Sequence, residues 1–326
     1  MDATFPDILT QLAGAEDVLV LSHDRPDGDA VGSALAMGLL LESQGKRVSV
    51  VNHDPVPETL AFLPQVDRVL SPSEYAKRGP SPDVVVVLDS AGKDRIGEAV
   101  WEVVPDGVPL INIDHHVSNT KFGDFNLVNS ASPATGQILF LLAESAEWSI
   151  DREVAALLYA AISTDTGSFR YPSTTADTMR IGGRLLELGV DAGKINQQLY
   201  ESYPRRRVEA IRKLLPGLRF ECDSRYASVK MPLTVTEELQ LKTGDTEGVI
   251  DLIREIDSVV ISVFYEELPN GRIRVSSRSK NPDYSVGDLC ARFGGGGHTL
   301  AAGARMPGPI EEAEERFLAA VREVLV

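Results

Sequence analysis

The sequence predicts an α/β protein of two domains, in which a doubly wound parallel sheet precedes a smaller α/β domain with a mixed sheet. Short apolar runs alternate with helical patterns up to about residue 190, as in parallel strands joined by right-handed crossovers. Beyond residue 216, β-rich runs are separated by short turns. The length of 326 residues also exceeds the size at which a single core usually stops growing.

Four buried strands are predicted in the first domain, at 18–21, 48–51, 84–88 and 110–113. The segment 29–44 carries apolar residues at helical spacing, and Gly45 follows it where a helix-ending glycine is expected. Helices are also predicted over 133–143 and 153–162. This alternation predicts a parallel sheet covered by helices on both faces.

The predicted boundaries are 1–185 for the first domain, 186–215 for a helical linker and 216–326 for the second domain, with a cleft expected between the two domains. In the second domain, strands are predicted at 226–229, 259–264 and 272–276. Pro269-Asn270-Gly271 is interpreted as a hairpin turn between the last two of these strands.

Composition and charge argue against several classes of protein. The net charge of −16 disfavours a protein that wraps long nucleic acid, because such proteins depend on many cationic contacts with phosphates. Cys222 and Cys290 are far apart in the sequence, so neither a disulfide scaffold nor a zinc ribbon is supported. No apolar run approaches the ~18 residues that cross a bilayer, and the N-terminus lacks a signal-peptide pattern. A cytoplasmic protein is therefore expected.

Acidic and histidine residues follow the predicted strands. Open parallel sheets collect ligands at the carboxyl ends of their strands, and carboxylates gathered there repel one another unless cations lie between them. A single Asp at a strand end is more often a turn or cap residue, but the joint occurrence favours a pair of metal ions. The residues are His23, Asp27 and Asp29 after the first strand, Asp89 after the third, Asp114, His115 and His116 after the fourth, and Asp165 after the helix at 153–162.

The types of these residues indicate the metal and its chemistry. A carboxylate-rich, partly imidazole ligand set favours Mn²⁺ or Mg²⁺ over thiolate-loving metals and does not choose between the two. Asp89 stands alone after its strand and is best placed to bridge, and Gly28 is interpreted as a sharp turn that lets Asp27 and Asp29 serve different ions. A metal pair can activate water for in-line attack on phosphorus. A serine nucleophile has weak support, since no Gly-x-Ser-x-Gly motif is present.

Five segments, in order, resemble the DHH phosphoesterase superfamily, in its subfamily with a C-terminal DHH-associated domain. The resemblance covers nearly the whole chain and implies two Mn²⁺ ions per chain, with Mg²⁺ able to substitute. One ion would be held by His23, Asp27 and Asp89, and the other by Asp29, Asp89, His115 and Asp165. Asp114 would orient His116, which would face the scissile phosphate, and both are expected to be catalytic residues. The segments are SHDRPDGDAVGS, VVLDS, NIDHH, STDTGSFRYPSTT and FGGGGHTLAAGA.

The second domain is expected to supply specificity. A glycine run lets backbone amides approach an anion closely, although an isolated run is more often a flexible loop or a helix stop. Arg272, Arg274 and Arg278 have even spacing and would share one face of a strand. The resemblance implies that Arg278 and His298 contact substrate phosphate. The predicted substrate-binding residues are Arg278, Gly295, Gly296, Gly297 and His298.

Two further basic or aromatic groups are interpreted as structural. Arg205-Arg206-Arg207 is predicted to be the solvated start of a helix rather than a binding patch. Phe169 and Tyr171 are predicted to pack against the protein rather than to stack on a base.

The resemblance implies a manganese-dependent phosphohydrolase that degrades very short RNA to mononucleotides and dephosphorylates 3′-phosphoadenosine 5′-phosphate by attack of metal-activated water. Its partners would be short RNA and 3′,5′-bisphosphate nucleotides, with no membrane and no long duplex nucleic acid, and a homodimer is expected. The alternative is a phosphodiesterase for cyclic or linear dinucleotides. A RecJ-like single-strand DNA exonuclease is less favoured, since it would need a further nucleic-acid-binding domain. A non-catalytic nucleotide sensor is disfavoured by the intact ligand set.

Overall fold

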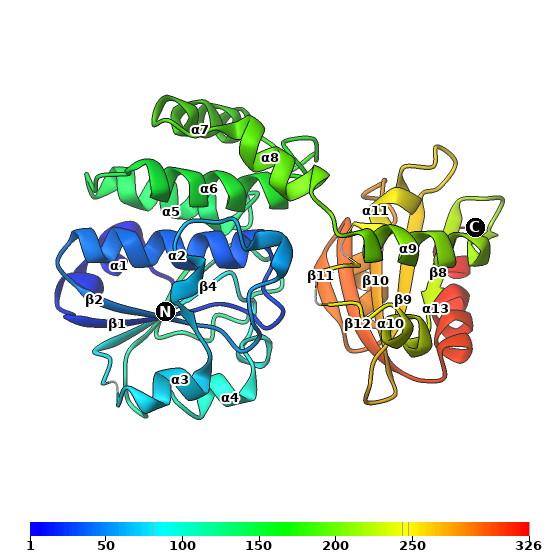
Figure 1. Ribbon diagram of the computed structural model, residues 1–326, viewed down its shortest axis with the longest axis horizontal. Coiled ribbons are helices and arrows are strands. Elements are labelled where there is room, and N and C mark those ends of the chain that lie inside the picture. The colour runs from blue at the N-terminus through cyan, green and yellow to red at the C-terminus, as the bar shows by residue number, and fades with distance from the viewer. Residues whose placement is uncertain (80, 243, 247, 326) are drawn as a thin grey trace. The chain divides into compact units, whose positions relative to one another are not determined.

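The chain forms two compact units, Met1–Ser202 and the part from Tyr203 onward, each with one six-stranded sheet (Figure 1). The computed structural model describes residues 1–79, 81–242, 244–246 and 248–325. The segment predicted as a linker contains two helices that belong to different units. These are α8 (Ala192–Glu201) in the first unit and α9 (Arg205–Leu214) in the second.

The sheet of the first unit is parallel throughout, with the strand order β3-β2-β1-β4-β5-β6. Successive strands are added toward one edge from β1 to β3 and toward the other edge from β4 to β6. The boundary between β1 and β4 is therefore the switch point where doubly wound folds bind ligands. The predicted strands are confirmed as β1, β2, β4 and β5. Two edge strands were not predicted: β3, which has only two residues, and β6, which has no continuous apolar run. The strands are β1 (Asp17–Leu21), β2 (Arg47–Val51), β3 (Val69–Leu70), β4 (Val84–Leu88), β5 (Leu110–Asp114) and β6 (Phe125–Val128).

Helices cover both faces of this sheet, with α2, α5 and α6 over one face and α3 and α4 over the other (Figure 1). The helix that carries Asp165 is longer than predicted, so Asp165 is its last residue and does not lie beyond it. No helix in the described segments has both the length and the apolar content to span a membrane. The helices are α1 (Phe5–Ala13), α2 (Gly28–Ser43), α3 (Pro72–Lys77), α4 (Glu98–Trp101), α5 (Thr135–Ser145), α6 (Arg152–Asp165) and α7 (Ala176–Glu187).

The second unit has a mixed sheet in the order β11-β12-β10-β9-β8-β7, in which only the β8–β9 pair is parallel. The predicted hairpin at Pro269-Asn270-Gly271 joins β9 to β10. Helices α12 and α13 cover one face, and α9 and α11 cover the other. The elements are β7 (Arg219–Glu221), β8 (Tyr226–Met231), α10 (Leu233–Glu238), α11 (Val249–Arg254), β9 (Ile261–Glu267), β10 (Arg272–Ser279), α12 (Val286–Ala291), β11 (Gly296–His298), β12 (Ala301–Pro307) and α13 (Ile310–Val324).

The basic start of α9 differs from the prediction, which is wrong for two of the three arginines. Arg205 is solvated, with a side chain 91% exposed. Arg206 instead forms two hydrogen bonds, of 2.5 and 3.0 Å, with the buried carboxylate of Asp245. Arg207 is buried, and its guanidinium carbon lies 3.4 Å from the centre of the Tyr203 ring. The difference arises because the sequence does not show which side of α9 faces the sheet.

The glycine run between α12 and β12 is partly strand, and its glycines have unequal roles. Gly297 has φ +139°, and a Cβ there would lie 2.6 Å from the carbonyl oxygen of Ala301 on the neighbouring strand. A Cβ on Gly296 would meet no heavy atom within 4 Å. Close packing against β12 therefore requires glycine at Gly297 but not at Gly296.

We expect Gly297→Ala to lower the free energy of unfolding of the second unit by ~1–3 kcal/mol, because alanine is strained at this φ and clashes with the strand backbone. The matched variant Gly296→Ala should change it by no more than ~0.5 kcal/mol. Urea unfolding followed by circular dichroism measures both. Equal stability of the two variants would contradict the packing role of Gly297.

Candidate functional site

The predicted metal ligands come together at the carboxyl edge of the first sheet, beside the β1/β4 switch point. They approach from the loops after β1, β4 and β5 and from the end of α6. Within each group below, donor atoms lie within 4.8 Å of one another. The groups are His23, Asp27 and Asp89; Asp29, His115 and Asp165; and Asp89, Asp114 and His116.

Asp89 is at the centre of this arrangement. Its Oδ2 lies 3.5 Å from Nε2 of His23, and its Oδ1 lies 3.4 Å from Nε2 of His115. The two oxygens of one carboxylate therefore face two different ligand groups. Asp89 is also held at φ +53°, which is uncommon for a non-glycine residue, and such strain concentrates at functional sites.

Asp27 and Asp29 occupy the start of α2. Asp27 caps the helix, and its Oδ1 accepts hydrogen bonds from the amides of Asp29 (3.0 Å) and Ala30 (3.1 Å). The interpretation of Gly28 as a sharp turn is wrong, because Gly28 is the first residue of the helix and has no positive φ. A Cβ there would lie 2.3 Å from Cγ2 of Thr164, so glycine allows α2 to pack closely against α6.

Backbone carbonyls orient His23 and His115. Nδ1 of His23 lies 2.7 Å from the carbonyl oxygen of Asp24, and Nδ1 of His115 lies 3.3 Å from that of Ser132. A carbonyl acceptor requires a proton on Nδ1, which leaves Nε2 of the neutral ring as the donor to a metal. Nε2 of His115 is 3.1 Å from Oδ2 of Asp165 and 3.8 Å from Oδ2 of Asp29.

His116 is held differently, by a buried carboxylate. Its Nδ1 lies 2.7 Å from Oδ1 of Asp114, which is fully buried. The other oxygen of Asp114 accepts a hydrogen bond of 2.6 Å from Asn119. Burial opposes charge on the His116 imidazole, but the Asp114 carboxylate outweighs it and raises the pKa of His116. Asn119 was not among the predicted site residues, since an asparagine in a loop has no distinctive local pattern.

The electrostatics of the cluster show a surplus of negative charge. Burial and the charges of Asp89 and Asp165 raise the pKa of Asp29 well above its ordinary range. Burial also tends to raise the pKa of Asp89. Hydrogen bonds with His115 and His23 oppose this effect and hold the pKa of Asp89 well below its ordinary value. Among the predicted metal ligands, four carboxylates and two imidazoles thus share one largely buried site. This oxygen-rich donor set fits hard divalent cations.

The predicted substrate residues lie in the second unit, where the sheet register brings two of them together. Arg278 on β10 pairs with Ala301 on β12, and His298 on β11 pairs with the same Ala301. Residues opposite one another on antiparallel strands point to the same face, so Arg278 and His298 share a face two strand spacings apart, or about 10 Å. β11 is the edge strand of this sheet.

The charges on that face differ in how strongly they are neutralised. Arg274 forms a close ion pair with Glu266, at 2.6 Å. Nε of Arg278 is 4.0 Å from the nearest carboxylate oxygen of Asp251, a much weaker contact. Arg278 is therefore the better placed of the two to bind an added anion.

The two aromatic residues after Asp165 pack as predicted. The Phe169 ring contacts the core, with its centre 5.7 Å from that of Tyr159. Tyr171 covers Gly167, where a Cβ would lie 2.3 Å from the tyrosine ring. This packing supports a left-handed turn, since Gly167, Ser168 and Phe169 all have φ between 55° and 61°.

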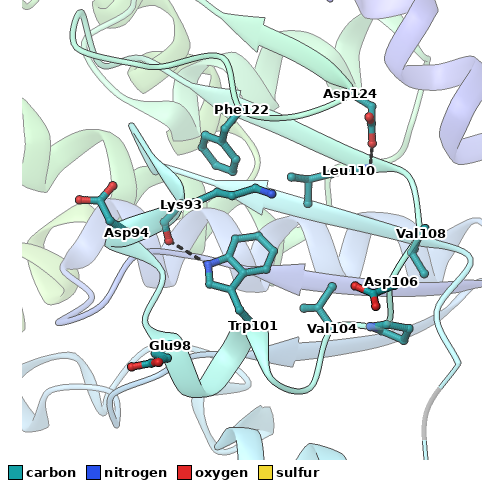
Figure 2. Close-up of a pocket in the computed structure, with 12 residues that line it drawn as sticks. Lys93, Asp94, Glu98, Trp101, Val104, Asp106, Val108, Leu110, Phe122 and Asp124 are labelled. Atoms are coloured by element: carbon teal, nitrogen blue, oxygen red, sulfur yellow. Dashed lines mark hydrogen bonds between the residues drawn. The ribbon is translucent and has the colours of Figure 1, made fainter.

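A separate cavity of about 790 Å³ lies beside α4 (Figure 2). Trp101 and Phe122 are among the residues that line it. The indole N–H of Trp101 donates to the carbonyl oxygen of Lys93 at 2.8 Å. None of the predicted site residues lines it. One lysine, Lys93, lines the cavity together with four carboxylates, and this excess of negative charge disfavours a nucleic-acid ligand. The four carboxylates belong to Asp94, Glu98, Asp106 and Asp124.

A doubly wound sheet with an acidic and histidine cluster at its switch point, followed by a mixed-sheet domain, defines a two-domain, metal-dependent class of phosphoesterase. The model of the DHH family N-terminal domain matches residues 17–162, and that of the DHHA1 domain matches residues 230–326. The chain belongs to the DHH family and is a hydrolase that acts on phosphoester bonds. The resemblance found in its motifs is thereby confirmed.

Two curated relatives and one solved structure extend this comparison. The chain is 33% identical to the bifunctional oligoribonuclease and PAP phosphatase NrnA of Thermus thermophilus, over 94% of this chain and 90% of that protein. It is 27% identical to the protein of the same name from Bacillus subtilis, over 89% of each. An exopolyphosphatase-related protein from Bacteroides fragilis has the same fold, with a TM-score of 0.88, 27% identity and coverage of 98% of this chain and 96% of that one.

Proposed function

We propose that the chain is a manganese-dependent exoribonuclease that degrades very short RNA to mononucleotides and also dephosphorylates 3′-phosphoadenosine 5′-phosphate. The observation that carries the proposal is the Asp89 carboxylate, whose two oxygens face two separate ligand groups. Such an arrangement is suited to two metal ions, and two-metal sites are typical of enzymes that cleave phosphodiesters. The names of the relatives support the substrate class.

In this proposal, His23, Asp27 and Asp89 would hold one Mn²⁺ ion. Asp29, His115 and Asp165 would hold the second, with Asp89 as a further ligand. When bound, the pair supplies Lewis acidity toward phosphoryl oxygens and makes water a stronger nucleophile.

His116 and residues of the second unit are proposed to contact the substrate. Asp114 fixes His116 through the 2.7 Å hydrogen bond and favours its protonated form. A positively charged His116 imidazole suits contact with an oxygen of the scissile phosphate, where negative charge develops during attack. Arg278, His298 and the glycine edge of β11 would bind the terminal phosphate of the substrate.

The proposal predicts a preference for short RNA. One metal pair and one cationic patch satisfy only a few phosphates, whereas the net charge of −16 repels the remainder of a long chain. We expect kcat/KM with Mn²⁺ to be highest on RNAs of about 2–5 nucleotides and to fall at least ~10-fold on a 24-mer, or ~1.4 kcal/mol in transition-state binding. The preference should narrow as salt rises, because screening weakens the repulsion.

Product chromatography on labelled RNAs of graded length measures this directly, with 3′-phosphoadenosine 5′-phosphate, cyclic dinucleotides and pyrophosphate as further substrates. Equal efficiency on 3-mers and 24-mers at low salt would overturn the proposed length preference. Faster hydrolysis of cyclic dinucleotides than of any short RNA would favour the phosphodiesterase alternative.

A further inference from the structure

The start of α5 contacts two carboxylates of the metal site. The amides of Thr135 and Gly136 donate to Oδ2 and Oδ1 of Asp29, at 2.6 and 2.9 Å. The side-chain hydroxyl of the same Thr135 donates to Oδ1 of Asp89 at 3.1 Å. Thr135 is completely buried. One residue therefore donates to both carboxylates, through its amide and through its hydroxyl.

Asp29 takes the place of a helix cap for α5. The residue at the cap position, Ala134, has no side chain that can accept a hydrogen bond, and the helix is not capped locally. The carboxylate that satisfies its first amides comes from 106 positions earlier in the chain. The helix dipole favours a negative charge at this end. The start of α5 therefore stabilises the negative charge of the Asp29 carboxylate, which burial and the neighbouring carboxylates disfavour.

The hydrogen bonds also restrict how Asp29 can bind anything else. A carboxylate has about four acceptor positions. Oδ1 already accepts from the Gly136 amide and from the Ser33 hydroxyl (2.8 Å), and Oδ2 accepts from the Thr135 amide. The acceptor position that remains is on Oδ2, the oxygen that lies 3.8 Å from Nε2 of His115.

We propose that Thr135 is a positioning residue, which fixes Asp29 and Asp89 relative to each other and thereby sets the affinity for the metal pair. The inference rests on the proposed two-metal site. Ser33 assists from α2, but it contacts Asp29 alone. Loss of the Thr135 hydroxyl should therefore disturb Asp89 and both ions, whereas loss of the Ser33 hydroxyl should disturb chiefly the ion assigned to Asp29.

The test is Thr135→Val in the full chain, because valine keeps the size and the backbone amide but removes the hydroxyl. Mn²⁺ affinity and stoichiometry are measured by calorimetry and by the electron paramagnetic resonance of the ion, separately from RNA hydrolysis. We expect Thr135→Val to weaken Mn²⁺ binding ~10–100-fold. Thr135→Ser, which keeps the hydroxyl, should restore binding to within ~3-fold of wild type, since the hydrogen bond to Asp89 persists.

Thr178→Val is the matched control. Thr178 is also fully buried, in the first turn of α7, and its hydroxyl hydrogen-bonds to Thr175 rather than to a carboxylate. It should lower stability to urea without changing Mn²⁺ affinity. Thr135→Ala removes the same hydroxyl and keeps the backbone amide, so it tests the same positioning if Thr135→Val does not fold.

The outcomes separate this inference from the proposed function. Two Mn²⁺ ions in the wild type with unchanged affinity in Thr135→Val, or in Thr135→Ala if the first variant does not fold, would overturn the positioning role alone. Fewer than two ions in the wild type would overturn the metal pair and the inference with it. Weakened binding in Thr178→Val equal to that in Thr135→Val would show a general loss of packing and would also overturn the inference.

Discussion

Replacement of Asp89 by asparagine is expected to abolish hydrolysis of short RNA and to release both metal ions. Asparagine has nearly the same size, so the buried site stays filled, but it removes the charge shared between the two ligand groups. We expect kcat/KM to fall at least ~1,000-fold, or ~4 kcal/mol of transition-state stabilisation. Mn²⁺ stoichiometry and activity are measured on the same preparation.

Two comparisons make this result specific to the bridging position. Asp29→Asn should lose one ion and retain the other, because Asp29 belongs to one ligand group only. Asp94→Asn removes an exposed carboxylate a few residues further along the chain and should leave metal content and activity as in wild type. Two ions bound to Asp89→Asn with wild-type affinity would rule out the bridging role of Asp89.

Removal of Arg278 is expected to give the second largest loss. If its guanidinium holds a substrate phosphate, Arg278→Ala should lower kcat/KM on short RNA by ~10–150-fold, since a charged hydrogen bond contributes ~1.5–3 kcal/mol. Both Mn²⁺ ions should remain bound, because the arginine lies in a different unit from the ligands. Arg272→Ala is the matched control, for it removes the same charge from the same face of β10 at its exposed end.

The neighbouring His298 allows this prediction to be tested further. Because Arg278 and His298 flank the same Ala301 in the sheet register, a phosphate that both contact would couple their effects. The loss in the double variant Arg278→Ala/His298→Ala should then differ from the sum of the single losses by at least ~0.5 kcal/mol. Strict additivity would indicate separate ligands, and unchanged kcat/KM in both single variants would show that this face does not bind substrate.

The four interior strands of the first sheet, three strands of the second sheet and the helices α2, α5 and α6 could be predicted, because their patterns are local. A fully buried run such as Val84–Leu88 has few alternatives to a parallel strand. The edges were harder to predict. β6 has only one core-facing side and β3 is two residues long, so neither carries a continuous apolar signal. The prediction for the start of α9 was wrong because three consecutive arginines have different surroundings: Arg205 is exposed, Arg206 is paired with Asp245, and Arg207 is buried.

The clustering of the acidic and histidine residues was predictable for a related reason. His23, Asp89 and Asp114 stand where buried strands end, and parallel strands bring those ends to one edge. The strand order that places β1 beside β4 cannot be read from periodicity. It determines that the Asp89 carboxylate lies between His23 and His115.

The sequence by itself determined the two-domain α/β class, the acidic and histidine residues that follow the strands and the chemistry proposed for them, because residue type and hydrophobic period are properties of short segments. Only the tertiary structure decided which groups hold those donors in place. Thr135 reaches Asp89 across 46 positions and Asp29 across 106, and the register of three strands brings Arg278 to His298. Hydrogen bonds over such separations depend on packing and strand order, which leave no local pattern in the chain.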